Sequence, residues 1–377
     1  MEGIPAEPEF SGYPRELRGR LGNMYDLDEI LIQSVKVRAS DIHLTTGRPP
    51  SYRIDGVLAP IEGERLTPQM LEDILMPLMD VRHREELQNN GQTDFAYAIS
   101  GVGRFRVNVF KQRGTLASVM RSLPFNIPEP EDLGIPAEVV EMTTRKRGLI
   151  LVTGPTGSGK STTLASLIHV INRNYPYHII TLEDPIEYLH RHDKSVVNQR
   201  EIGSDSTNYA QALRAALRED PDVILVGEMR DLETISTAIT AAETGHLVFS
   251  TLHTIGADKT IDRIIDVFPP NQQQQIRIQL ASVLECVVSQ QLLKKADGSG
   301  RVAALEILFA NNAVRNLSRE SKTYQISSVM QTSKRAGMQT MDDALYDLYM
   351  RKLIDADNAV TYAQDPVSMN KKVSFDF

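Results

Sequence analysis

The chain lacks three features that would each point to a particular class of protein. It has one cysteine among 377 residues, which excludes an intramolecular disulfide and a four-cysteine zinc site. Its net charge of −8 argues against an electrostatic grip on nucleic acid, for which a basic surface is the first sign. No apolar run approaches the roughly 20 residues of a membrane span, and the acidic, proline-rich start does not resemble a signal peptide. We therefore expect a cytoplasmic protein, or one held at a membrane by its partners.

A glycine-rich loop is the most informative feature that the chain does contain. The apolar run Gly148–Thr153 leads into G-x-x-x-x-G-K-S, whose candidate nucleotide-binding residues are Gly154, Pro155, Thr156, Gly157, Ser158, Gly159, Lys160, Ser161 and Thr162. The glycines let successive backbone N–H groups turn toward phosphate oxygens, and a helix beginning near Lys160 adds its positive N-terminal end. Lys160 would reach the β- and γ-phosphates, and Ser161 would hold magnesium. The pattern predicts a P-loop that binds ATP with Mg²⁺.

The length predicts two or three domains. Four prolines between Pro124 and Pro136 restrict helix and strand alike and indicate a linker. The expected segments are a flexible extension at 1–24, an α+β domain at 25–123, the linker at 124–147, the nucleotide-binding core at 148–295, a C-terminal helical region at 296–365 and a tail at 366–377.

The first of these domains shows both helical and alternating patterns. A helix is expected from Tyr25 through Val35, and a longer helical segment over Pro68–Gln88. Short alternating runs predict strands at 41–44, 51–54 and 103–110, and Asp55-Gly56, directly after the second of these runs, predicts a hairpin turn.

Short apolar runs alternate with helical patterns after the linker, at 149–153, 179–182, 223–226 and 247–251. Such runs are typical of a parallel sheet that is buried on both faces, so the fold class is α/β, with the P-loop at the carboxyl end of the first core strand. From Gln272 onward the pattern is interpreted as helical. Its first apolar stripe runs from Ile276 to Val288 and places Cys286 as a buried, inert thiol on a helix.

Two acidic clusters follow predicted strands downstream of the P-loop. Glu183, Asp184 and Glu187 come after the strand ending at Leu182, and Glu228 comes after the strand ending at Val226. A parallel sheet would bring both clusters beside the phosphates, where ATP hydrolysis needs a carboxylate to activate water. Because Gly227 precedes Glu228, we expect Glu228 to contact magnesium through water. The alternative is that these are solvated surface acids.

Histidines and arginines complete the set of candidate residues. His246 and His253 flank the strand Leu247–Thr251, and we expect His253 to sense the γ-phosphate; the alternative is a structural role for both. In the first domain, arginines on strands are candidates for a finger that reaches the ATP of a neighbouring subunit or domain, and a solvated basic face is the alternative. These arginines are Arg104, Arg106, Arg113 and Arg121.

These motifs in this order resemble those of the type II/IV secretion ATPases, and among them most closely the retraction ATPases of type IV pili. The matching segments are the Walker A motif at 154–162, the Asp box at 181–188, an atypical Walker B motif at 226–234 and the His box at 242–254. The likeness covers roughly residues 26–365. The family's C-terminal signature A-I-R-N-L-I-R-E appears as Ala313–Glu320, with Ser318 in place of an apolar residue.

The resemblance implies a hexameric ring in which a PAS-like first domain packs on the RecA-like core of the next subunit. It implies that Glu187 is the catalytic base, Glu228 the Walker B acid, His246 and His253 the His box, and Arg104 with Arg121 the contacts made in trans. The implied function is ATP-driven retraction of a pilus through an inner-membrane platform protein, beside an assembly ATPase and a paralogous retraction ATPase. An assembly or type II secretion ATPase, an accessory paralogue, a nucleic-acid translocase and a non-hydrolysing ring protein are the alternatives.

Overall fold

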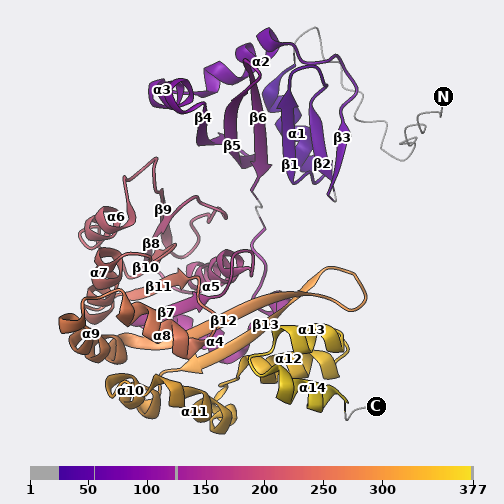
Figure 1. Ribbon diagram of the computed structural model, residues 1–377. Coiled ribbons are helices and arrows are strands. Elements are labelled where there is room, and N and C mark those ends of the chain that lie inside the picture. Colours follow the sequence, from indigo (N-terminus) through magenta and orange to yellow (C-terminus); the bar gives the residue numbers. More distant parts are fainter. Residues whose placement is uncertain (1–24, 55, 124–125, 375–377) are drawn as a thin grey trace. The chain divides into compact units, whose positions relative to one another are not determined.

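The computed structural model describes residues 25–54, 56–123 and 126–374. The expected extension at 1–24 and the hairpin residue Asp55 therefore lie outside the described residues. The chain divides into two compact units, 1–125 and 126–377, which are described separately below (Figure 1).

The first unit is a six-stranded antiparallel sheet with helices on one face (Figure 1). Its strand order is β3-β2-β1-β6-β5-β4. The strands are β1 (Asp41–Thr45), β2 (Ser51–Ile54), β3 (Val57–Pro60), β4 (Gln92–Ile99), β5 (Gly103–Gln112) and β6 (Thr115–Ser122). The helices are α1 (Leu27–Lys36), α2 (Pro68–Leu75), η2 (Met76–Leu78) and α3 (Val81–Asn90). Leu31, Leu71 and Leu87 of these helices pack with Phe105 and Val107 of β5 in one core.

The helical segment expected at Pro68–Gln88 is divided into three pieces, for a local reason. Pro77 cannot donate the backbone hydrogen bond that would continue α2. Asp80 then starts a new helix, because its carboxylate accepts a hydrogen bond from the backbone N–H of His83 and caps α3.

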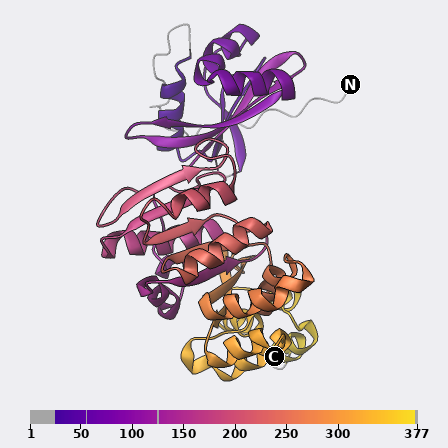
Figure 2. The ribbon, with the colours of Figure 1, turned by 90° about the vertical axis from the view of Figure 1, so that its left-hand side faces the viewer.

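The second unit is built on a seven-stranded sheet in the order β13-β12-β7-β11-β10-β8-β9, whose strands are labelled in Figure 1; Figure 2 shows the same ribbon turned by 90°. Its strands are β7 (Gly148–Thr153), β8 (His178–Glu183), β9 (Val196–Glu201), β10 (Val223–Val226), β11 (Leu247–Leu252), β12 (Leu284–Lys294) and β13 (Arg301–Phe309). All neighbouring pairs are parallel except β12 and β13, which are antiparallel. The α/β class with a parallel-rich sheet is confirmed.

Helices cover both faces of this sheet. Leu149 and Leu151 of β7 face one core, and the residues between them, Ile150 and Val152, face the other. The first face is covered by α6 (Tyr209–Ala216), α7 (Leu232–Glu243), α8 (Ala257–Asp266), α9 (Pro270–Val283), α10 (Asn312–Arg319) and α11 (Ile326–Thr332). The second is covered by α4 (Ala137–Glu141), η4 (Met142–Thr144) and α5 (Lys160–Asn174).

The expected linker proves to be partly structured. Residues 126–147 fall in the second unit and form η3 (Glu131–Leu133), α4 and η4. Ile135, Val139 and Met142 are buried against β7 and α5. The prolines divide this segment into short helices, but its apolar residues still belong to the core.

The helical interpretation from Gln272 to the end was wrong for two strands. Helix α9 ends at Val283, and the remainder of the apolar stripe is β12, which pairs with β7 and β13. Cys286 is fully buried as expected, but on a strand, where burial raises the pKa of its thiol. Both faces of β12 are buried, so its run of apolar residues carries no alternation that would mark a strand.

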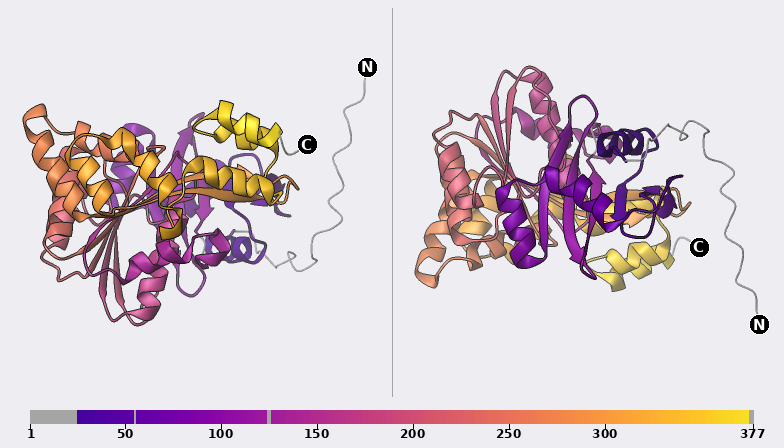
Figure 3. Two further views of the ribbon diagram at one scale, coloured as in Figure 1. Left: turned by 90° about the horizontal axis from the view of Figure 1, so that it is seen from below. Right: turned by 90° about the horizontal axis from the view of Figure 1, so that it is seen from above.

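The C-terminal helices form a separate cluster beside the β12–β13 hairpin (Figure 3). They are α12 (Met341–Met350), α13 (Ala356–Tyr362) and α14 (Pro366–Ser374), and they follow the short helices η5 (Thr323–Gln325) and η6 (Lys334–Ala336). The expected tail at 366–377 was wrong where it is described, because α14 buries Met369 and Val373 in this cluster. Within the described residues, no helix has the length and apolar character to cross a bilayer.

Candidate nucleotide site

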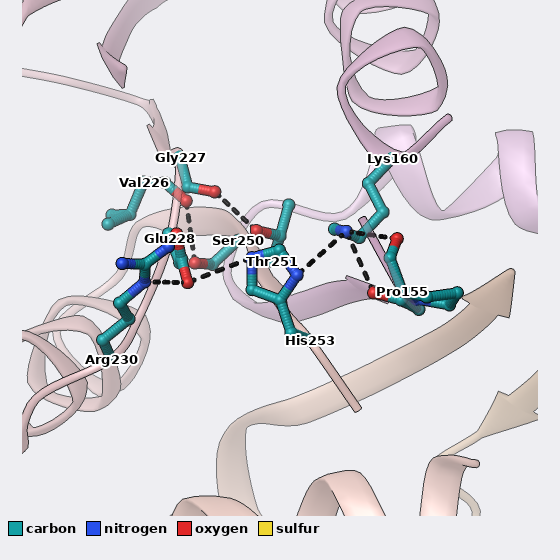
Figure 4. A network of polar contacts seen from close by, with 10 residues as sticks. Pro155, Lys160, Val226, Gly227, Glu228, Arg230, Ser250, Thr251 and His253 are labelled. Atoms are coloured by element: carbon teal, nitrogen blue, oxygen red, sulfur yellow. Dashed lines mark hydrogen bonds and ion pairs between the residues drawn. The ribbon is translucent and has the colours of Figure 1, made fainter. Parts of the chain in front are cut away.

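The P-loop connects β7 to α5 at the carboxyl end of the central sheet. Gly159 adopts a left-handed conformation, with φ of 90°, and α5 begins at Lys160 as the sequence predicts. The ammonium group of Lys160 donates hydrogen bonds to the carbonyl oxygens of Gly154 (2.9 Å) and Pro155 (3.0 Å). The loop therefore curls around its own lysine, which keeps the cation at the mouth of the phosphate site (Figure 4).

A buried glutamine on β12 holds the loop from behind. The side chain of Gln290 donates a hydrogen bond to the Ser158 carbonyl oxygen (2.6 Å) and accepts one from Thr163 Oγ1 (2.8 Å). A Cβ atom on Gly154 would lie 2.2 Å from the Gln290 carbonyl oxygen, so only glycine fits there. Sequence reasoning missed Gln290, because nothing in its local sequence links it to a loop so far away in the chain.

His253 lies between Lys160 and Glu228 (Figure 4). Its Nε2 atom is 3.2 Å from Glu228 Oε1, and its Nδ1 atom is 3.5 Å from the Lys160 ammonium nitrogen. A carboxylate accepts and an ammonium donates, so both contacts suit a neutral imidazole that carries its proton on Nε2. The structure thus brings together three predicted residues, from the P-loop, from the end of β10 and from the end of β11.

Glu228 has a second partner that the sequence did not indicate. Arg230 Nε donates a hydrogen bond to the same oxygen, Glu228 Oε1, while most of the Arg230 side chain is exposed. The close packing around Gly227 explains why this position at the strand end holds glycine and not the usual aspartate. A Cβ atom at Gly227 would lie 2.8 Å from the Tyr209 hydroxyl oxygen and 3.0 Å from the Leu182 carbonyl oxygen.

The two glutamates of the Asp box differ sharply in environment. Glu183 is half-buried and accepts hydrogen bonds from Thr181 Oγ1 (2.6 Å) and Gln199 Nε2 (3.1 Å). Burial raises the pKa of Glu183, and these hydrogen bonds only partly oppose the rise. Glu187 and Asp184, by contrast, are exposed. The arrangement suits Glu183 for shaping the loop and leaves Glu187 accessible to a water molecule.

The Asp box is tied to the P-loop helix by a direct contact. The hydroxyls of Thr162 and Tyr188 are 2.8 Å apart, and the Tyr188 carbonyl oxygen accepts a hydrogen bond from Gln199 of β9. Thr162 is therefore engaged by the protein itself, whereas Ser161 before it is half-buried at the N-terminus of α5.

The positive charge of Lys160 is opposed by burial and favoured by nearby carboxylates. Burial lowers the pKa of its ammonium group, and the carboxylates of Glu228 and Glu187 oppose that shift. The opposing effects show that both candidate acids lie close enough to Lys160 to share its electrostatic environment. A cation beside a curled backbone loop, in the field of carboxylates, suits the binding of a magnesium-bound triphosphate.

His246 does not belong to this site. It precedes β11 at the amino end, where its Nδ1 atom lies 2.9 Å from the Ala241 carbonyl oxygen. The seven residues from His246 to His253 span about 20 Å of extended chain. His246 therefore serves the turn between α7 and β11, whereas His253 lies beside the P-loop lysine.

The four arginines lie in the first unit. Arg106 and Arg121 are directly opposed on β5 and β6, on the face away from the helices, and both are exposed. Arg121 donates a 2.9 Å hydrogen bond to Asp41. Arg104 lies on the same face of β5 and is half-buried, whereas Arg113 lies in the β5–β6 turn with φ of 47°. Arg113 is therefore separated from the strand positions where we expected it.

The residues of the P-loop are suited to binding ATP and magnesium. The Ser158 hydroxyl is buried and, within the described chain, has no hydrogen-bond partner. Gly157 and Gly159 adopt positive φ angles that open the backbone toward Lys160. Ser161 would supply one hydroxyl to Mg²⁺, which typically keeps water and phosphate oxygens as its other ligands, so a cage of protein carboxylates is not needed.

The segment resembling the family's C-terminal signature is a helix, α10. Arg315 donates to Glu285 Oε1 (2.8 Å) and to the carbonyl oxygens of Ala281 (2.7 Å) and Ser282 (3.0 Å), so it holds α10 to the α9–β12 junction. Ser318, where an apolar residue was expected, is buried and bonds the Val314 carbonyl oxygen. The exposed side chains of α10 include Arg319.

Comparison with known proteins places this geometry in a family. The family model described as type II/IV secretion system protein matches residues 23–372. The type IV pilus retractation ATPase PilT of Pseudomonas aeruginosa is 47% identical over 341 residues, which cover 90% of this chain and 99% of that protein. The type IV pilus ATPase PilU of the same organism is 38% identical over 338 residues, covering 90% of this chain and 88% of PilU.

A solved structure agrees with these sequence matches. The crystal structure of the pilus retraction motor PilT with bound ADP superimposes with a TM-score of 0.86 and 54% identity, over 92% of this chain and 99% of the other. Sequence, site geometry and fold lead to one conclusion: the chain belongs to the type II/IV secretion system protein family.

Proposed function

We propose that this chain is an ATP-hydrolysing motor that retracts a type IV pilus, working as a homohexameric ring. The observation that carries the proposal is the 47% identity to a pilus retraction ATPase over nearly its whole length. The P-loop lysine with His253 and Glu228 at its side supplies the chemistry that such a motor needs.

Hydrolysis is assigned to residues of the second unit. The P-loop N–H groups and Lys160 would bind the phosphates, Ser161 would hold magnesium, and Glu228 would contact the ion through water. When bound there, magnesium would supply positive charge that neutralises the phosphates. Glu187 takes the proton from the attacking water, because it is the exposed carboxylate near Lys160. His253 loses its contact with Lys160 when the lysine turns to phosphate.

The arginines of the first unit act in trans. Arg104 and Arg121 reach the ATP of a neighbouring subunit, and Arg106 and Arg113 support that surface. His246 lies too far from its own P-loop to take part there. A ring is needed for such contacts, because each active site then takes residues from two subunits.

The motor works at the cytoplasmic face of the inner membrane. Its partners are the inner-membrane platform protein of the pilus, the assembly ATPase and a paralogous retraction ATPase. Nucleic acid is not a partner, consistent with the net charge of −8.

The test pairs an enzyme assay with a cell assay. Lys160→Ala should abolish ATP turnover and weaken nucleotide binding, because it removes the cation placed at the phosphates. Cells that carry only this variant should display many surface pili that do not retract. Lys146→Ala, an exposed lysine before β7, is the matched control and should retain both activities. Near-normal turnover of Lys160→Ala would overturn the assignment of the site.

The cell assay also separates the nearest alternatives. Loss of an assembly or secretion ATPase should leave cells without pili or without secretion, whereas loss of a retraction motor leaves static pili. The match to PilU favours one further candidate, an accessory retraction ATPase. In that case retraction would persist in the deletion strain but with less force.

A further inference from the structure

Glu306 on β13 is a buried carboxylate that contacts three separate parts of the second unit. Its side chain accepts hydrogen bonds from the backbone N–H of Ala257 (2.6 Å), the backbone N–H of Met341 (3.2 Å) and the side-chain amide of Gln364 (2.8 Å). The residue is only 3% exposed. A charge buried to this degree is normally retained only where its partners compensate for the lost water.

Two of these three donors are the first amides of helices. Ala257 begins α8 and Met341 begins α12, so Glu306 lies at two positive helix ends. Helix α8 depends on this contact, because its N-cap residue Gly256 has no side chain to cap it. Burial raises the pKa of Glu306, and the hydrogen bonds donated to it favour the ionised form.

The contact between Glu306 and α8 lies close to the nucleotide site along the chain. Helix α8 begins four residues after His253, and the intervening loop is fixed by two contacts. The backbone N–H of Gly256 donates to Ser289 Oγ (3.0 Å), and the hydroxyls of Thr254 and Thr260 are 2.7 Å apart. Ser289 is the β12 residue paired with Glu306 in the sheet.

The other two contacts of Glu306 are made with the C-terminal helices and the loop between them. Met341 begins α12, and Gln364 lies between α13 and α14. These helices pack on one another through Leu345, Met369 and Val373, in a cluster separate from the cores around the P-loop strand. Glu306 is therefore a direct polar link between the segment that carries His253 and the helices at the end of the chain.

We propose that Glu306 is a positioning residue that couples the His253 loop to the C-terminal helices α12–α14. The inference rests on the proposed function, because it assumes that nucleotide changes the contacts of His253. When His253 shifts, α8 shifts with it, and the carboxylate held by α8 carries the change to α12 and Gln364. The C-terminal helices thereby report the nucleotide state of the site.

Amide hydrogen exchange of the full chain, with and without ADP and magnesium, tests the coupling. In the wild type, ADP should slow exchange at the P-loop and also at the start of α12. In Glu306→Gln, slowing at the P-loop should remain while the effect at α12 is lost, because one backbone donor then faces an amide instead of a carboxylate. Gln364→Ala removes only the C-terminal contact and should weaken the α12 effect without loosening α8.

The matched control for these variants is Asp347→Asn. Asp347 is exposed on α12 and pairs with Arg351, so the substitution also converts an acid to an amide on the affected helix. It should leave the ADP effect at α12 intact. An α12 response that is absent from the wild type, or that survives in Glu306→Gln, would overturn the proposal.

Turnover provides a second readout, which a purely structural role would not produce. Glu306→Gln should lower kcat about tenfold, with KM changed less than about threefold. An effect of this size is typical of residues that belong to one hydrogen-bond network. In a His253→Ala background the same substitution should cost almost nothing further. Equal losses in both backgrounds would show that Glu306 does not act through His253. Failure of the proposed function looks different, since the wild type itself would then not hydrolyse ATP.

Discussion

The side chain of Gln290 donates a 2.6 Å hydrogen bond to the carbonyl oxygen of Ser158, across a sequence separation of 132 residues. The same side chain accepts a hydrogen bond from Thr163 on the first turn of α5. One residue of β12 thus braces both the phosphate loop and the helix that follows it.

Replacing this brace should damage stability and nucleotide binding together. Gln290→Ala leaves a buried hydroxyl and a buried carbonyl without partners, so we expect a loss of about 1–3 kcal/mol in the free energy of unfolding. ADP affinity should also fall, because the loop loses its support. Denaturant titration and fluorescent-ADP binding measure the two effects. Gln291→Ala is the control, since Gln291 points to the other face of β12, toward Tyr362; equal loss of ADP affinity in both variants would contradict the assignment.

Substitution of the two site glutamates separates the base from the supporting acid. Glu187→Gln should bind ATP normally and lose roughly 10²- to 10⁴-fold in turnover, the usual worth of a general base. Glu228→Gln should alter nucleotide affinity as well, because it removes the negative charge that faces both His253 and Arg230. Single-turnover hydrolysis beside equilibrium binding distinguishes them. The reverse pattern would exchange the two roles.

Mixed rings test whether Arg121 acts on a neighbouring subunit. Arg121→Ala should lower turnover while leaving nucleotide affinity nearly unchanged, and arginine fingers in related reactions are worth about 10³- to 10⁵-fold. Mixing Arg121→Ala with Lys160→Ala subunits should restore activity where an intact arginine meets an intact P-loop. Arg53→Ala controls for the loss of a partner to Asp41, because Arg53 lies 4.0 Å from the same carboxylate. No recovery at any mixing ratio would place Arg121 outside the trans site.

The pair of Asp41 and Arg121 should also give the first unit a pH-dependent stability. Burial alone would raise the pKa of Asp41, but hydrogen bonds from Arg121 and Ser40 outweigh it and lower the pKa below the ordinary 3.8. Stability from this group is therefore present above about pH 4 and lost as the pH falls through the folded-state pKa. Acid titration of unfolding should show a smaller decrease below pH 4 for Asp41→Asn than for the wild type. An unchanged profile would mean that the pair contributes nothing.

Substitution of two arginines on α10 should distinguish a role in coupling ATP hydrolysis to retraction from a role in folding. Arg319→Ala alters an exposed position and should leave soluble ATPase activity within a few-fold of wild type while reducing pilus retraction in cells. Arg315→Ala breaks the contact with Glu285 and two carbonyl oxygens, so stability and both activities should fall together. ATPase assays on intact rings and retraction counts on fluorescent pili give the answer. If Arg319→Ala retracts normally, that side of α10 has no role in coupling.

The central part of the second unit could be predicted from local pattern, because β7, β8, β10 and β11 are buried on both faces and each appears as a short apolar run. The edge strand β9 gave no such signal, since Val196 and Asn198 are exposed. Helix α9 and strand β12 were merged into one helix, because the apolar residues of a fully buried strand also satisfy a helical spacing. In each failure the deciding contact came from a distant segment.

The residues of the candidate site also fall into those that the local sequence predicts and those that it does not. Lys160, Glu228 and His253 each follow a predicted strand, so the parallel topology was enough to bring them together. Gln290, Arg230 and Gln199 depend on tertiary contacts and had no local motif. His246 and His253 flank one strand, so the sequence already places the two histidines at opposite ends of the sheet, and His253 is the one at the P-loop end.

The position of β12 has a consequence during protein synthesis. The P-loop is synthesised long before Gln290, and β7 lacks one of its two neighbouring strands until β12 has been made. A nascent chain that ends before β12 therefore exposes one edge of the P-loop strand and an unbraced phosphate loop. We therefore expect ATP binding to be acquired only after β12 has been made.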